Sequence, residues 1–201
     1  IATARGKLPA LKKQLQPMRH DNQILVYCGD GTLRDDEGEA VGRQIDGAVQ
    51  LIGSELQMLT ATFTAKTSSE QRKILIDEFS QGRIQAMVAI RCLDEGVDMP
   101  SVRTAFLLAS TTNPRQFIQR RGRVLRRAQG KSHAHIIDFV IIPPESDMPE
   151  SDAMRHYAKN LIRSQMKRVS EFAGLAENSP FARSVVHDLL VRYNLLDSWE
   201  E

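Results

Sequence analysis

Residues 84–90, Ile-Gln-Ala-Met-Val-Ala-Ile, form a nearly continuous apolar run that has the length of a β-strand. Similar runs occur earlier in the chain at Ile24–Cys28 and later at residues 103–109. Continuous apolar strands of this kind are typical of a parallel sheet that helices cover on both faces. Two further strand candidates, residues 56–62 and 133–142, complete the predicted sheet.

Helical patterns separate these strand candidates. In order along the chain they are the spacing of Leu8, Leu11 and Leu15, the stripe of Val41, Ile45, Val49 and Ile52 within residues 40–53, the segment from Ser68 to Gly82, and residues 114–123. The third pattern resembles a capping box, because Ser68 and Ser69 precede Glu70-Gln71, and Gly82 is expected to end the helix. The alternation of strands and helices predicts an α/β fold with right-handed crossovers.

The composition changes after the fifth strand candidate. Residues 143–152 are rich in proline, serine and acidic side chains, which is typical of a linker. Beyond it, two helices are predicted, the first ending at Gly174 and the second beginning with Ser179-Pro180. Their predicted apolar stripes are Met154, Tyr157, Leu161, Gln165, Val169 and Phe172, and then Phe181, Val185, Leu189 and Leu196. The sequence thus predicts an α/β domain at 1–142, a linker at 143–152 and a helical extension at 153–201.

The composition favours a globular protein without a resident metal. Of the 201 residues, 41% are hydrophobic, and no apolar run approaches the length that spans a bilayer. Cys28 and Cys92 lie far apart without zinc-ligand spacing, so neither a zinc site nor a disulfide framework is expected. His133 and His135 alternate as surface and core positions of a strand would. No signal-peptide segment follows Ile1, and we expect a cytoplasmic protein.

Positive charge is concentrated in one part of the chain. The formal net charge is only +2, but residues 99–137 contain no acidic side chain. The basic residues in that stretch are Arg103, Arg115, Arg120, Arg121, Arg123, Arg126, Arg127 and Lys131. Such a cluster indicates a polyanionic partner, which could be a nucleotide, a nucleic acid or both.

The most informative part of this stretch is residues 119–126, Gln-Arg-Arg-Gly-Arg-Val-Leu-Arg. Arginine is always charged, and its planar fork matches the oxygens of a phosphate group. A glycine within the segment permits close approach of another group. These residues suit the charge that develops on a transferring phosphoryl group, and a solvated basic helix or a nonspecific phosphate patch is the alternative.

The order Q-x-x-G-R-x-x-R in this segment resembles motif VI of superfamily 2 helicases. Residues 89–100, with Gly96-Val97-Asp98-Met99-Pro100 at their end, resemble motif V, and residues 24–29 resemble motif IV. The strand and capped helix between motifs IV and V also follow the family's order. Residues 20–142 therefore resemble the C-terminal RecA-like domain of DEAD/DEAH-type helicases.

The resemblance implies a role for each matching residue. Arg123 and Arg126 would be arginine fingers that reach the γ-phosphate of ATP held by another RecA-like domain. The residues implied in ATP binding and its coupling to domain closure are Gln119, Gly96, Asp98 and Gly122.

The resemblance also implies contacts to the backbone of one nucleic-acid strand. Loops after the strands would make them, at Gly29, at Thr60 and Ala61, and at Arg91 and Cys92. Open α/β sheets bind ligands at the carboxyl ends of their strands, which agrees with this placement. The family often has Thr or Ser near position 90, whereas Ile90 and Arg91 stand here. Arg91 could contact a phosphate, or it could pair with Asp94 or Glu95.

The chain lacks the parts that hold ATP. Gly130-Lys131-Ser132 resembles the end of a P-loop, but Leu125 stands where that loop needs a glycine. Asp94-Glu95 follows an apolar run as a Walker B pair does, yet the motif V resemblance explains it better. ATP and Mg²⁺ would therefore be bound mainly by an N-terminal RecA-like domain outside this chain, and the chain alone should not hydrolyse ATP.

These patterns lead to one functional expectation and one alternative. We expect the C-terminal half of an ATP-dependent helicase or translocase that acts on single-stranded or duplex DNA, with RNA less favoured. The forms of motifs V and VI resemble those of DNA translocases in repair, restriction and phage-defence systems. The alternative is a non-catalytic nucleic-acid-binding or regulatory module with a degenerate helicase fold.

Overall fold

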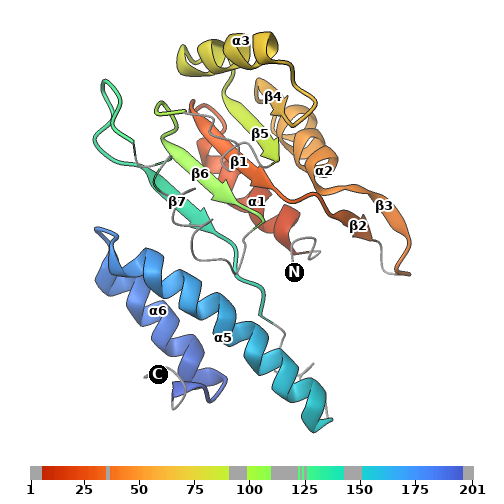
Figure 1. Cartoon of the computed structure of the whole chain (residues 1–201), viewed down its shortest axis with the longest axis vertical. Helices are drawn as coiled ribbons and strands as arrows, with labels where there is room; N and C mark the ends of the chain where they lie inside the picture. Colours follow the sequence, from red (N-terminus) through yellow and green to blue (C-terminus); the bar gives the residue numbers. More distant parts are fainter. Residues whose placement is uncertain are drawn as a thin grey trace. The chain divides into compact units, whose positions relative to one another are not determined.

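The computed structural model describes residues 6–34, 37–90, 99–109, 122, 124, 126–142 and 151–196. Contacts within the chain divide it into two compact units, Ile1–Phe139 and Val140–Glu201. The first unit contains a sheet with its helices, and the second contains two helices (Figure 1). No helix in the described part of the chain is long and apolar enough to cross a membrane.

The central sheet of the first unit is parallel throughout. Its order is β4 (Thr60–Phe63), β5 (Ala86–Ile90), β1 (Ile24–Cys28), β6 (Thr104–Leu107) and β7 (His135–Asp138). All four neighbouring pairs run parallel, and Val26 of β1 lies opposite Val88 on one side and Phe106 on the other. The predicted parallel α/β sheet is therefore confirmed.

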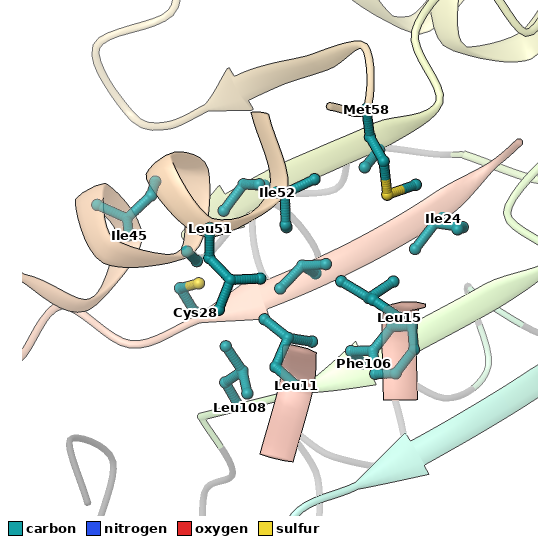
Figure 2. Packing of buried hydrophobic residues seen from close by; sticks show 14 of the residues in the cluster. Leu11, Leu15, Ile24, Cys28, Ile45, Leu51, Ile52, Met58, Phe106 and Leu108 are labelled. Atoms are coloured by element: carbon teal, nitrogen blue, oxygen red, sulfur yellow. The ribbon is translucent and has the colours of Figure 1, made fainter. Parts of the chain in front are cut away.

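Every residue of β1, β5 and β6 is buried, as expected for central strands that helices cover. On one face, Ile24 and Cys28 of β1 pack with Leu11 and Leu15 of α1 (Lys7–Leu15), as Figure 2 shows. The same cluster takes in Ile45 of α2 (Gln44–Gln50) and residues of the following π-helical turn, Leu51–Glu55. A short 3₁₀ turn, Gln16–Met18, follows α1.

The helix expected at residues 40–53 begins later than predicted. Residues Ala40–Arg43 form β3, which pairs antiparallel with β2 (Thr32–Arg34), and α2 starts only at Gln44. Gly42 has a φ of +138°, which no α-helix accommodates, and the β-branched Val41 is 59% exposed. Placing Val41 on the buried helical stripe was therefore wrong.

The capped helix was predicted correctly. In α3 (Ser69–Ser80), the backbone N–H of Gln71 donates to the Ser68 hydroxyl, and the Ser68 N–H donates to the Gln71 side-chain oxygen. This reciprocal capping box satisfies two donors that a helix start otherwise leaves without partners. Gly82, with a φ of +75°, follows the helix as its stop.

The second unit consists of α5 (Asp152–Gly174) and α6 (Ser179–Arg192). Their shared core contains Ile162, Met166, Val186, Leu190, Tyr193 and Leu195. The amide of Gln165 binds both the N–H and the carbonyl of Ile141, at 2.9 and 2.7 Å, so this buried polar side chain is satisfied. Gly174 ends its helix as expected, whereas residues 143–150 of the predicted linker lie outside the described residues.

Parts of the predicted apolar stripes in this unit are wrong. Met154, Tyr157 and Phe181 are 61%, 71% and 69% exposed. Each helix instead contributes residues four positions apart, Ile162 and Met166 from α5 and Val186 and Leu190 from α6. Residues at this spacing share one helix face. The last helix also has Asn178 at its N-cap position and ends at Arg192, before Leu196.

Candidate nucleotide and nucleic-acid interface

The carboxyl ends of the parallel strands meet at one edge of the sheet. Cys28 lies opposite Ile90, and Phe63 lies opposite Ala89, so the last residues of β1, β4 and β5 lie side by side. Gly29 is the first residue after β1. Arg91 and Cys92, which follow β5, lie outside the described residues.

Gly29 is held by a buried side chain that the sequence did not single out. Its backbone N–H donates to the side-chain oxygen of Gln44 at 2.7 Å, and Gln44 is fully buried. The Gln44 N–H in turn donates to the carbonyl of Gly31 at 3.1 Å, and Arg43 forms an ion pair with Asp30 at 2.5 Å. The turn after β1 is therefore fixed at its root, from which the β2–β3 hairpin continues (Figure 1).

Thr60 and Ala61 were expected in a loop after a strand, but they are the first two residues of β4. They face Ala86 and Met87, the first residues of β5, and are thus at the amino edge of the sheet. The Thr60 hydroxyl donates to the Ala86 carbonyl at 3.0 Å. The strand starts later than predicted because the preceding π-helical turn continues to Glu55 and uses the apolar Leu56 as its cap.

The loop that does follow β4 presents a lysine that sequence reasoning missed. The N–H of Thr64 donates to the Thr67 hydroxyl at 3.1 Å, and the Arg72 Nε donates to the Thr67 carbonyl at 2.9 Å. The Arg72 guanidinium also lies 5.3 Å from the centre of the Phe63 ring. These contacts order the loop, and Lys66 at its tip is exposed. The signal available was a lone lysine four positions after the strand candidate at residues 56–62.

Only part of the arginine-rich segment falls within the described residues. Gln119 and Arg123 lie outside them, as do Gly96 and Asp98 of the segment that resembles motif V. Gly122 and Arg126 are exposed, and Val124 between them is 2% exposed. An added Cβ at Gly122 would meet no atom within 4 Å in the described part of the chain.

Arg126 and Gly29 belong to opposite edges of the sheet. The carbonyl of Arg126 accepts a hydrogen bond from the Lys131 Nζ, as does the carbonyl of Pro100. Arg126 and Pro100 belong to segments that lead into β7 and β6, which are neighbouring strands (Figure 1). The first residues of these strands, His135 and Thr104, lie opposite each other. The arrangement separates the predicted nucleotide contact of Arg126 from the predicted strand contact of Gly29.

The structure agrees with the absence of a P-loop at Gly130-Lys131. A P-loop joins a strand to the start of a helix, but this segment leads into the strand β7. Among the described residues, no three carboxylate, thiol or imidazole groups lie together as metal ligands.

Comparison with known proteins identifies the family. Residues 6–128 match the model of the helicase conserved C-terminal domain. The chain is 36% identical over 69 residues to the DNA 3'-5' translocase XPB2 of Sulfurisphaera tokodaii, a match covering 34% of this chain and 16% of that protein. It is 33% identical over 104 residues to Dicer-like protein 2 of Cryphonectria parasitica, a match covering 52% of this chain and 6% of that protein. The matches thus span a small share of either relative's length.

Solved structures show the same fold. The C-terminal part of the Fun30 ATPase domain matches with a TM-score of 0.54 and 18% identity, over 80% of this chain and 54% of that one. The RNA helicase Prp28 from Chaetomium thermophilum, bound to ADP, matches with a TM-score of 0.52 and 16% identity, over 82% and 34%. Because the family model matches more than half of the chain, the chain belongs to the helicase conserved C-terminal domain family, and its fold is RecA-like.

Proposed function

We propose that this chain is the C-terminal half of an ATP-dependent nucleic-acid helicase or translocase. The observation that carries the proposal is the family match over residues 6–128, which includes the arginine-rich segment up to Arg126. In that segment a buried valine, Val124, anchors the backbone while Arg126 is exposed. An exposed arginine on an anchored backbone is suited to reach a phosphate held by another domain.

The proposed nucleotide chemistry uses Arg123 and Arg126 as arginine fingers. Their guanidiniums would stabilise the negative charge that develops on the γ-phosphoryl group during transfer. Gln119, Gly96, Asp98 and Gly122 would couple nucleotide binding to domain closure. An N-terminal RecA-like domain would supply the P-loop and the carboxylates that hold Mg²⁺, so this chain alone would not hydrolyse ATP.

The proposed nucleic-acid contacts lie at the carboxyl edge of the sheet. Gly29 and the exposed Lys66 are described there, and Arg91 with Cys92 would extend the same row. Contacts of this type bind the phosphate backbone and carry little sequence information. Thr60 and Ala61 are left out of this proposal because β4 places them at the opposite edge.

DNA is the proposed substrate. The similarity to a protein named as a DNA 3'-5' translocase supports this choice, as do the forms of Gly96–Pro100 and Arg121–Arg126 in the sequence. A DNA repair, restriction or phage-defence system in the cytoplasm is the proposed setting. Binding of single-stranded DNA and RNA of equal length, compared at one salt concentration, tests the choice directly.

The decisive experiment replaces the two arginines in the complete protein. Arg123→Ala or Arg126→Ala should lower kcat for ATP by a factor of about a thousand or more, while binding to single-stranded DNA is retained. Arg83→Ala, which removes an exposed arginine paired with Glu78, is the matched control and should leave kcat unchanged. Normal turnover in either arginine-finger variant would contradict the assignment, and no DNA-stimulated turnover in the wild type would favour a non-catalytic module.

A further inference from the structure

A tight turn directs Lys131 back onto the arginine-rich segment. The backbone N–H of Lys131 donates to the carbonyl of Ala128 at 3.1 Å, which closes the turn over four residues. Gly130 has a φ of +67°, a conformation that glycine adopts without strain. The chain therefore reverses between Ala128 and Lys131, and the Lys131 side chain returns along the residues that precede the turn.

The ammonium group of Lys131 binds three backbone carbonyls. Its Nζ lies 2.6 Å from the oxygen of Val124, 3.0 Å from that of Arg126 and 3.0 Å from that of Pro100. A lysine ammonium has three N–H donors, so these carbonyls can use all of them. Hydrogen bonds from a charged donor are stronger than those between neutral groups. Lys131 thus holds the backbone at Val124 and at Arg126.

The third carbonyl comes from a separate part of the chain. Pro100 lies 31 positions before Lys131 and ends the segment that resembles motif V. That segment connects Ile90, at the carboxyl edge with Gly29, to Pro100, which precedes β6. Lys131 therefore ties the end of the segment that leaves the nucleic-acid edge to the backbone that carries Arg126.

We propose that Lys131 is a positioning residue that fixes the Arg126 backbone to Pro100, so that the arginine finger and the strand-contacting edge move together. The inference rests on the proposed function, because it assigns to Lys131 the alignment of the proposed arginine finger. It also explains the Gly130-Lys131 pair, which does not form a P-loop.

In the described part of the chain, Lys131 is bound by backbone carbonyls and not by a carboxylate. Residues 99–137 contain no carboxylate, and the acceptors of Lys131 are carbonyl dipoles. Burial lowers the pKa of Lys131, and the positive charge of Arg103 lowers it further. A half-buried ammonium beside another cation is costly, and the three hydrogen bonds to backbone carbonyls offset that cost only while Val124, Arg126 and Pro100 are held together.

The test compares variants of the complete protein. Lys131→Met keeps an unbranched side chain only one atom shorter but removes all three donors, and Lys73→Met makes the same change at an exposed position of α3. We expect Lys131→Met to lower DNA-stimulated kcat by about 10- to 100-fold, since small misplacements of a reacting group cost about that much. KM for ATP and DNA affinity should change less than threefold. Lys131→Arg, which restores charged donors, should recover part of the lost kcat.

The ratio of kcat with DNA to kcat without DNA provides a readout that simple destabilisation would not change. Loss of folded protein lowers both rates equally, whereas loss of alignment should lower the ratio, with the active fraction measured by nucleotide binding. Wild-type kcat in Lys131→Met, or equal losses in both rates, would overturn the proposal. If Arg126→Ala also kept wild-type kcat, the proposed function would fail instead, so the two failures are distinguishable.

Discussion

Replacing Gln44 with methionine should loosen the root of the proposed nucleic-acid edge. Gln44 is fully buried, and its side-chain oxygen accepts the N–H of Gly29 at 2.7 Å. Methionine has nearly the same volume, so the substitution removes the acceptor without opening a large cavity. The Gly29 N–H is then left without this partner at the end of a buried strand.

The expected magnitude follows from the burial of the two groups. An unsatisfied buried donor costs about 1–3 kcal/mol, and the lower half of that range applies because Gly29 is only half-buried and water can reach it. In chains of 150–250 residues each kcal/mol shifts Tm by about 2–4 °C. We therefore expect Gln44→Met to lower Tm of the first unit by about 2–8 °C.

Hydrogen exchange measured by mass spectrometry is the assay that locates the effect. Amides of residues 24–31 should exchange faster in Gln44→Met, while those of α5 should not change. Gln50→Met makes the same substitution at an exposed position of the same helix and is the control. Unchanged stability and exchange in Gln44→Met, or equal changes in both variants, would refute the reasoning.

Two other substitutions test the edge and the second unit. Lys66→Glu should weaken binding to single-stranded DNA and reduce the slope of log affinity against log salt by about 1 or more. Lys73→Glu, on the exposed face of α3, should change neither quantity. Equal slopes for the two variants would show that Lys66 does not contact DNA. Met166→Ala, at a fully buried position, should lower the free energy of unfolding of the helical unit in urea by about 2–5 kcal/mol. Met154→Ala, at a position 61% exposed, should change that free energy by less than about 0.5 kcal/mol. Similar losses in the two variants would contradict the packing of α5 on α6.

The central strands could be predicted because their apolar character is continuous. Ile24–Cys28 was predicted with its observed bounds, since a strand buried on both faces needs no polar alternation. Ser68 and Gln71 also predicted the start of α3, because capping depends on local residue types alone. Features set by contacts between nearby residues in the chain were thus accessible from the sequence.

Features set by tertiary contacts were not accessible. Val41 fits the helical spacing of Ile45 and Val49, but pairing of β3 with β2 overrides that pattern. Phe181 is as apolar as a core residue, and only the packing of α5 on α6 shows that Val186 is buried instead. Thr60 was misplaced because β4 begins at Thr60 and ends at Phe63, so that Thr60 is the first residue of the strand and does not follow it.

The candidate site shows the same division. The order of residues 119–126 marks Arg126 without any structure, because that order resembles motif VI. Gln44 and Lys131, which we propose to hold the site in place, bind backbone atoms 15 and 31 positions away. No sequence pattern distinguishes such side chains from other glutamines and lysines, since their partners are carbonyl and N–H groups that every residue carries.

ATP hydrolysis by this purified chain, with and without single-stranded DNA, tests the central claim most directly. The account predicts no turnover in either condition and DNA-stimulated turnover once the N-terminal RecA-like half of the protein is present. Clear DNA-stimulated hydrolysis by the chain alone would mean that a complete nucleotide site lies within its 201 residues, and would contradict the account.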